Sequence, residues 1–137
     1  MNRVMIKALL ILAVTALTSF FAWGAEKPDI FKATVDKNGV QRIEMVGGSY
    51  YFKPNDVIVK KNIPVEIVVS KAPGSGSHSL VLHAAEAGID FEVELSTVPQ
   101  SIRFTPAKAG KYPFYCDEGF IVSHRAKGME GVLEVTD

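Results

Sequence analysis

Apolar and polar residues alternate with a period of two along most of the chain, and this limits the fold more than any other feature. Ile89–Leu95 alternates without a break, and Gln41–Val46, Gln100–Thr105 and Lys111–Cys116 follow the same pattern. Such alternation is typical of a strand with one buried face. Turn residues, as in Asp36–Gly39, separate the segments, and almost no helical period is present. The chain is therefore predicted to be all-β, an antiparallel Greek-key β-sandwich or barrel of about eight short strands.

The N-terminal segment has the pattern of a secretory signal peptide. Arg3 and Lys7 precede an uncharged apolar run, Ala8–Phe21, and Ala22–Gly24 supplies small residues at the two positions that a signal peptidase reads. We expect cleavage before Ala25, so that residues 1–24 are removed. An uncleaved membrane anchor is the alternative, although the apolar run is short for a membrane span. The pattern predicts a periplasmic or secreted protein.

The segment 25–137 contains 113 residues, with 13 basic and 15 acidic side chains. This size fits one domain with a core large enough to fold without disulfide bonds, which a single cysteine cannot form within the chain. The charge is nearly balanced and forms no basic patch, so nucleic acid is not an expected partner. We expect a monomer with no stable membrane insertion after signal cleavage.

Four residues suggest the chemistry of the domain. The only cysteine, Cys116, is followed by His124 and Met129, while His78 lies upstream on the core-facing side of a predicted strand, from which His83 points away. An unpaired thiol in an exported protein is open to oxidation, which suggests that something occupies it. A thiolate, two imidazoles and a distant thioether form the ligand set of a mononuclear copper site. The pattern predicts one copper ion that alternates between Cu(I) and Cu(II).

Other interpretations of these residues stay open. His78 can be a core histidine, His124 a surface histidine, and Met129 a side chain that only fills the core. A carboxylate from Asp117 or Glu118 in the copper sphere would give a more tetragonal site, so Glu118 competes with Met129 as axial ligand. Calcium and magnesium would require clustered carboxylates, and structural zinc usually uses more thiolates. Copper therefore fits the residues best.

Short motifs in a fixed order run along nearly the whole segment after residue 24. Each is weak alone, but their order and spacing are specific: Tyr51-Phe52-Lys53-Pro54, Val57–Lys61, Pro64-Val65, His78, Phe104-Thr105-Pro106, Ala109–Tyr112, Phe114-Tyr115-Cys116 and Gly128–Gly131. In this order the chain resembles a small cupredoxin of the plastocyanin and azurin superfamily. The resemblance implies a copper-binding Greek-key sandwich that transfers electrons outside the cytoplasm. Its metal ligands would be His78, Cys116, His124 and Met129.

The sequence departs from the family pattern at two places. Seven residues, Asp117–Ser123, separate Cys116 from His124, whereas family members usually have a shorter spacer. His124 can reach the metal if these residues form an outward bulge or a helical turn. The second departure is Ser79, which follows the first histidine where the family commonly has an asparagine that ties two loops together. We expect Ser79 to tie them less firmly.

Three apolar residues, Phe120–Val122, lie in the long spacer. They either pack as a small satellite core or present an apolar surface on which a redox partner docks near His124.

The leading functional hypothesis is a one-electron carrier and not an enzyme. The alternative is a periplasmic copper-handling protein, such as a scavenger, chaperone or resistance protein that holds copper without redox cycling. An enzyme in which His124 activates Cys116 as a nucleophile is disfavoured, because no orienting third group or oxyanion device is evident. A purely structural immunoglobulin-like sandwich would leave the four-residue set unexplained.

Overall fold

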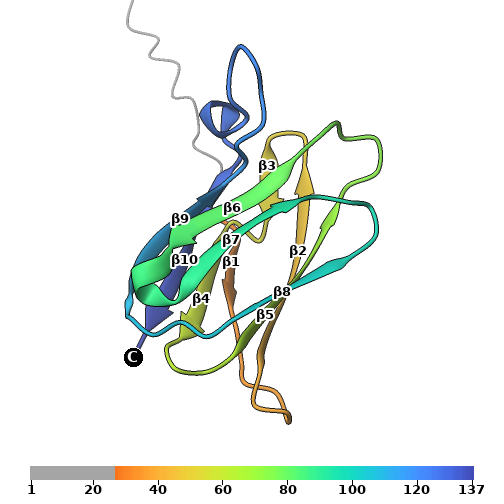
Figure 1. Cartoon of the computed structure of the whole chain (residues 1–137). Coiled ribbons are helices and arrows are strands. Elements are labelled where there is room, and N and C mark those ends of the chain that lie inside the picture. Colours follow the sequence, from red (N-terminus) through yellow and green to blue (C-terminus); the bar gives the residue numbers. More distant parts are fainter. Residues whose placement is uncertain (1–26) are drawn as a thin grey trace, which may run out of the picture.

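The computed structural model describes residues 27–137, so the predicted signal peptide of residues 1–24 lies outside the described residues. This part of the chain contains ten strands and two short 3-10 helices (Figure 1). The elements are, in order, β1 (Ile30–Lys32), β2 (Gln41–Gly48), β3 (Tyr51–Lys53), β4 (Asp56–Lys60), β5 (Val65–Lys71), β6 (Ser79–Ala84), η1 (Ala85–Ala87), β7 (Ile89–Glu94), β8 (Gln100–Phe104), β9 (Gly110–Tyr115), η2 (Arg125–Lys127) and β10 (Glu130–Thr136). Among these residues, no helix is long and apolar enough to cross a membrane.

The strands form two facing sheets. One sheet has six strands in the order β1-β4-β10-β9-β6-β7, and the other has four in the order β3-β2-β5-β8. The predicted all-β sandwich is confirmed. The strand count is ten within residues 27–137 rather than about eight, because β1 and β3 are only three residues long and show little alternation.

The prediction of a wholly antiparallel arrangement was wrong. Strand β4 lies parallel to both β1 and β10, and β2 lies parallel to β5. The alternation of side chains is the same in parallel and antiparallel strands, so the sequence pattern carried no information on strand direction. Both sheets are therefore mixed.

The alternating residues fill the space between the sheets as predicted. Ile43 and Met45 of β2 are buried while their neighbours Arg42 and Glu44 are exposed. Phe52 and Phe114 meet edge to face across the core, with ring centroids 5.4 Å apart, a preferred geometry for aromatic pairs. The core residues come from every strand except β1, so burial of this face holds both sheets together.

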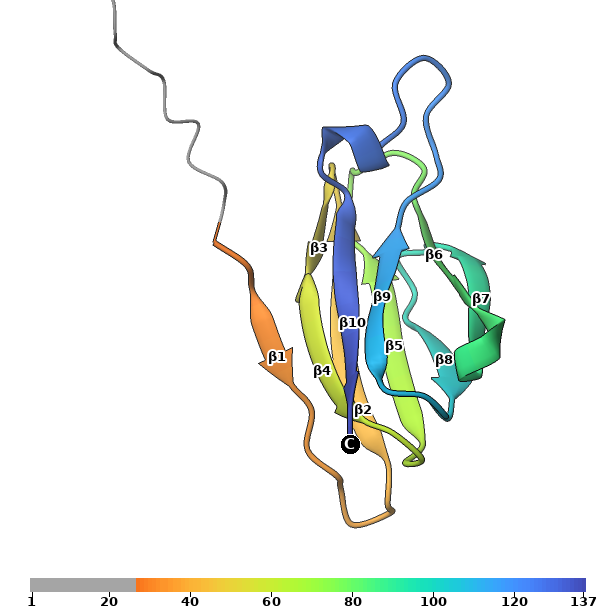
Figure 2. The ribbon, with the colours of Figure 1, turned by 90° about the vertical axis from the view of Figure 1, so that its left-hand side faces the viewer.

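Strands β9 and β10 form a hairpin whose long connection lies at one end of the sandwich. Their register runs from Glu130 opposite Tyr115 to Val135 opposite Gly110. The connection, residues 116–129, protrudes beyond the strands at the end opposite the C-terminus (Figure 2). All of the predicted ligands downstream of β6 belong to this connection.

Candidate metal centre

The pairing of β6 with β9 brings the first predicted ligand to the hairpin. Val81 of β6 lies opposite Tyr115 of β9 in antiparallel register. Continuing that register places Ser79 beside Asp117, and His78 comes directly before Ser79. The His78 carbonyl also accepts a hydrogen bond from the Leu95 amide at 2.8 Å. Residues almost forty positions apart in sequence therefore meet at one end of the sandwich.

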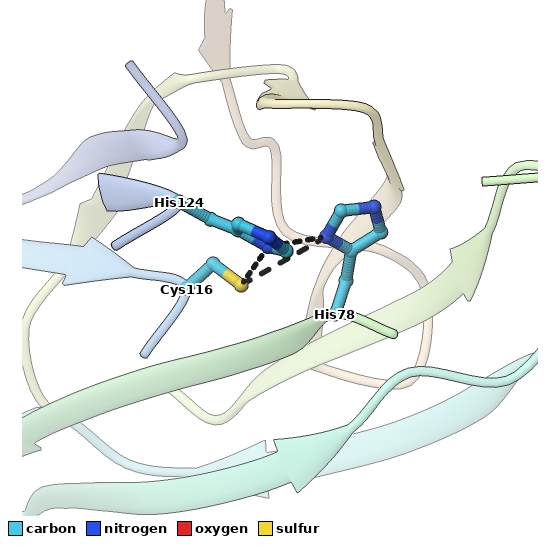
Figure 3. Close-up of side chains that lie close together, drawn as sticks. All are labelled: His78, Cys116 and His124. Carbon is cyan, nitrogen blue, oxygen red and sulfur yellow. Dashed lines mark hydrogen bonds between the residues drawn. The ribbon is translucent and has the colours of Figure 1, made fainter. Parts of the chain in front are cut away.

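Three donor atoms converge at this point (Figure 3). The Nδ1 atoms of His78 and His124 are 3.1 Å apart, and the Cys116 Sγ lies 3.9 Å from the first and 3.5 Å from the second. A point in the plane of the three atoms is about 2 Å from each of them, close to the length of transition-metal bonds to imidazole and thiolate. Within residues 27–137 these three residues form the cluster that could hold a metal, and no carboxylate belongs to it. The donors therefore fit a copper ion.

His78 is held by burial. Its side chain is 2% exposed, and this burial lowers the pKa of His78 below its ordinary value, with a smaller contribution from the neighbouring His124. The imidazole is therefore neutral near pH 7, which is the form that binds metals. Its Nε2 atom is buried without a hydrogen-bond partner among the described residues, so packing and the contacts of Nδ1 with His124 and Cys116 orient this ring.

Cys116 is fully buried, as predicted for the residue that ends a core-facing strand. Ser79 contacts its sulfur twice, through the backbone amide at 3.4 Å and through Oγ at 3.7 Å. The Ser79 hydroxyl also accepts a hydrogen bond from the Asp117 amide at 3.0 Å and donates to the Asp117 carboxylate. Ser79 thus connects the two loops by several contacts, and the Asp117 carboxylate faces Ser79.

The seven residues between Cys116 and His124 form an outward bulge, which is one of the two arrangements predicted. The His124 amide donates to the Glu118 carbonyl at 2.8 Å, so the chain leaves at Glu118 and returns to nearly the same place at His124. Gly119 has φ +113°, where a side chain would be strained. We call residues 119–123 the finger. Because the finger closes at its base, the seven-residue spacer does not displace His124, whose imidazole lies against the Cys116 sulfur.

The apolar residues of the finger do not form the satellite core that was one alternative. Phe120 and Ile121 are 103% and 91% exposed, and Val122 is 49% exposed. The finger extends away from both sheets (Figure 2), so these side chains have no core within reach. The alternative of an exposed apolar surface is the one that the structure favours.

Met129 ends the hairpin connection and is hydrogen-bonded through its backbone to the two other predicted ligands of that connection. Its amide donates to the His124 carbonyl at 3.0 Å, and its carbonyl accepts from the Cys116 amide at 3.1 Å. The helix η2 directs the chain toward this position and ends at Gly128, where φ is +100°. The Met129 side chain is fully buried. The backbone of Met129 is thus bonded to both His124 and Cys116.

Sequence reasoning missed one residue that contacts the cluster. The rings of Tyr50 and His124 pack edge to face, with centroids 5.1 Å apart. Tyr50 lies in the turn between β2 and β3, and no motif connects it with the hairpin, so only the tertiary structure reveals the contact. His83, by contrast, is at the surface as predicted, where it pairs with Asp90 at 2.7 Å.

Comparison with known proteins gives the family. The model of the cupredoxin-like domain matches residues 9–133, which is most of the chain. The chain belongs to the cupredoxin-like domain family. The resemblance that the sequence motifs indicated is therefore confirmed. A search of curated proteins found no match.

Solved cupredoxin structures have the same fold. The chain is 25% identical to the metal-binding domain of the Cu(I)-exporting P-type ATPase CopA of Streptococcus pneumoniae, solved with Cu(I), with a TM-score of 0.60 over 81% of this chain and 99% of that one. It is 20% identical to auracyanin A, a blue copper protein of Chloroflexus aurantiacus, with a TM-score of 0.54 over 72% of this chain and 100% of that one. The auracyanin of Roseiflexus castenholzii is 19% identical, with a TM-score of 0.53 over 77% of this chain and 99% of that one.

The donor atoms of three predicted ligands converge. The fourth predicted ligand, Met129, is hydrogen-bonded to His124 and Cys116 through its backbone. Glu118, the predicted competitor for the axial position, contributes its backbone carbonyl to the base of the finger. The cupredoxin fold with this cluster is consistent with a blue-copper site.

Proposed function

We propose that this cupredoxin is an exported carrier of single electrons that binds one copper ion through His78, Cys116, His124 and, axially, Met129. The observation that carries the proposal is the convergence of one thiol sulfur and two imidazole nitrogens at the end of the sandwich, at distances that suit one ion. A bound copper ion supplies the Cu(II)/Cu(I) couple, which accepts one electron from a reduced donor and passes it to an oxidised acceptor.

The burial of the ligands suits electron transfer better than catalysis. Cys116 and His78 are buried, whereas His124 is half-buried and lies at the end of the molecule. A fully buried sulfur that already accepts a hydrogen bond from the Ser79 amide is poorly placed to attack a substrate carbon. Electrons need only a close approach of two proteins, and the partly open His124 allows one. This argument supports a carrier rather than an enzyme with a cysteine nucleophile.

The finger supplies a surface for that approach. Phe120 and Ile121 are almost wholly exposed close to His124 in the chain, and exposed apolar groups of this kind mark sites of association. We propose that redox partners dock on Phe120–Val122 and the neighbouring edge of His124. The signal-peptide pattern of residues 1–24 supports a periplasmic or secreted location for this exchange.

Copper handling is the second candidate function. It is favoured by the similarity to the metal-binding domain of a Cu(I)-exporting ATPase, which was solved with Cu(I). A handling protein would bind Cu(I) tightly and exchange electrons slowly, because transfer of the ion rather than of an electron would be its task. The same four residues would serve either function.

Copper titration tests the site. We expect the purified protein to bind one Cu(II) with an intense thiolate-to-copper absorption band that disappears in Cys116→Ser. His83→Ala is the matched control, because His83 is exposed, pairs with Asp90 and is not part of the cluster, and it should leave the band unchanged. A protein that shows no band with copper would refute the proposed site.

Redox measurements then separate the two functions. A carrier should show a reversible one-electron couple and rapid electron self-exchange. Very tight Cu(I) binding with slow self-exchange would exclude the carrier and support copper handling.

A further inference from the structure

Of the proposed ligands, His124 is the one whose side chain the core encloses least. Cys116 follows directly on a strand, and His78 is buried against the core. His124 comes after the finger and is only half-buried. The His124 backbone is bonded to Glu118 at the base of the finger and to the Met129 amide. The orientation of its half-buried imidazole therefore depends on side-chain contacts.

Tyr50 makes such a contact. Its ring packs against the His124 ring at an interplanar angle of 75°, in the edge-to-face arrangement that aromatic rings prefer. Lys127 of η2 contacts the same tyrosine: its Nζ lies 4.4 Å from the ring centroid and donates to the Tyr50 hydroxyl at 3.1 Å. The turn between β2 and β3 is thereby connected to both the proposed ligand and the helix that follows it.

A second cation–π contact fixes the other side of η2. The Arg125 guanidinium lies 4.3 Å from the ring centroid of Tyr115, the residue before Cys116, and donates to Glu130 at 2.8 Å. Arg125 thus connects η2 to the end of β9 and the start of β10, and Lys127 connects it to the turn between β2 and β3. The His124 ring itself lies against His78 and Cys116, and Tyr50 is a side chain outside the ligand set that also contacts it.

The backbone of Tyr50 is strained. Its φ is +67°, in the left-handed region that aromatic residues rarely adopt. The other non-glycine residue with positive φ among residues 27–137 is Asn62, a residue type that tolerates this conformation. Glycine or asparagine would form the turn at Tyr50 with less strain. Strained residues persist where the surrounding structure holds them, and they gather at functional sites.

We propose that Tyr50 is a positioning residue for His124, which holds the imidazole with its Nδ1 toward Cys116 and so compensates for the long spacer. Lys127 in turn holds Tyr50. The inference rests on the proposed function, in which His124 binds copper, and it assigns a role to a residue outside the ligand set. The ring of Tyr50, rather than its hydroxyl, carries the effect, because the ring makes the contact with His124.

Three variants of Tyr50 separate the effect of its aromatic ring from the effect of its strained backbone. Tyr50→Phe keeps the ring and the strain, whereas Tyr50→Gly and Tyr50→Asn remove the ring and suit the positive φ. Because these two relieve strain, both should fold. Tyr51→Ala is the matched control: Tyr51 is the next residue, is similarly exposed, and also lies beneath a cation, Lys53, at 5.6 Å.

Two measurements report on the inference. The first is the NMR order parameter of the His124 ring in the metal-free protein. In Tyr50→Gly and Tyr50→Asn we expect it to fall from a value typical of rigid groups, about 0.85, toward the range of flexible ones, below about 0.6. The second is the dissociation constant for Cu(II), which should rise about tenfold or more in the same variants, as when other groups that orient a ligand are lost. Tyr50→Phe and Tyr51→Ala should match the wild type in both.

The outcomes are distinct. An unchanged His124 ring in both Tyr50→Gly and Tyr50→Asn would overturn the proposal, as would an equal effect of Tyr51→Ala. If the wild-type protein bound no copper, the proposed function would fail. The order parameter of the metal-free protein would then still decide whether Tyr50 positions His124.

Discussion

At the scale of single residues, Ser79 determines much of the surroundings of the Cys116 sulfur. Its amide and its hydroxyl both approach Sγ, and its Oγ accepts from the Asp117 amide at 3.0 Å. Hydrogen bonds to a copper-bound thiolate weaken its electron donation and tune the potential. A serine can therefore connect the two loops even though it lacks the reach of the asparagine that the family commonly has here.

The variant Ser79→Ala should cost about 1 kcal/mol of unfolding free energy, since the Asp117 amide loses its acceptor and the Asp117 carboxylate loses its donor. Chemical denaturation would measure the effect. Ser77→Ala, at an exposed position in the preceding loop, is the control and should leave the unfolding free energy unchanged. A wild-type unfolding free energy in Ser79→Ala would contradict the connecting role of the hydroxyl.

The variant Met129→Leu separates the axial-ligand interpretation from that of a core side chain. The two side chains have similar volumes, so the unfolding free energy should fall by less than about 1.5 kcal/mol. Loss of a thioether that donates to the metal should destabilise Cu(II) more than Cu(I) and raise the reduction potential. Met45→Leu is the control, because Met45 is equally buried but belongs to β2. If both variants had the wild-type potential, Met129 would be a core residue only.

At the scale of elements, the finger is an addition to the hairpin that the core does not require. Its base is closed by the His124 amide and the Glu118 carbonyl, and its apolar tip contacts neither sheet. Exposed side chains contribute little to folding stability.

The double variant Phe120→Ser/Ile121→Ser should leave the unfolding free energy within about 0.5 kcal/mol of the wild type and leave the copper band unchanged. Electron exchange with a redox partner should slow, because the proposed docking surface would lose its apolar groups. Stopped-flow kinetics with the partner would measure this. A control with Val98→Ser, an exposed apolar residue elsewhere, should exchange electrons at the wild-type rate. Equal rates for all three proteins would exclude the finger as a docking surface.

The four-stranded sheet carries a charged bridge on its outer face. Glu66 of β5 pairs with Arg42 of β2 and accepts two hydrogen bonds from Arg103 of β8, at 3.0 and 2.8 Å. The hydrogen bond from Arg103 lowers the pKa of Glu66 below its ordinary value, and Ser101 and Arg42 act in the same direction. One carboxylate thus connects three neighbouring strands.

The pH dependence of stability should reflect this bridge. Since the pKa of Glu66 is lower in the folded than in the unfolded protein, its contribution is present above the unfolded value, about 4.3, and is lost as the pH falls through the folded value. The variant Glu66→Gln should therefore have a lower Tm than the wild type at neutral pH, with a difference that shrinks in acid. Thermal unfolding across the pH range would measure it, with the exposed Glu44→Gln as control. A Tm difference between Glu66→Gln and the wild type that did not change with pH would refute the role of the Glu66 charge.

At the scale of the whole molecule, the proposed ligands connect parts of the chain that are distant in sequence. His78 precedes β6, Cys116 follows β9, and His124 and Met129 belong to the connection to β10. The cluster forms only when β6 lies beside β9 in its native register. A metal that binds this arrangement binds the folded state and not the unfolded chain.

Copper should therefore stabilise the entire domain. At a free copper concentration a hundredfold above the dissociation constant, the gain is about 2.7 kcal/mol, which corresponds to an increase in Tm on the order of 10 °C for a domain of this size. Differential scanning calorimetry with and without copper would measure it. Cys116→Ser should show little or no increase, and an equal increase in that variant would place the copper elsewhere.

The sequence alone was sufficient to predict the class of fold and to name the three residues whose donor atoms meet, and ligation by Met129 stays a prediction. Alternation in segments such as Ile89–Leu95 is a local property, and it predicted which side chains face the core. The set of His78, Cys116, His124 and Met129 indicated a copper site, because few metal sites combine one thiolate, two imidazoles and a thioether. The burial of Cys116 followed from its place on the core-facing side of a strand.

How these residues are arranged and held depends on the tertiary structure. Strand direction, the outward course of the finger, the contacts of Ser79 and the packing of Tyr50 against His124 all depend on pairings between distant segments. Local alternation is the same whichever strand lies next to it, and an apolar triplet such as Phe120–Val122 suits a core or a surface equally well. The sequence determined which donors are available, and the packing of the two sheets determined where they meet and what holds them there.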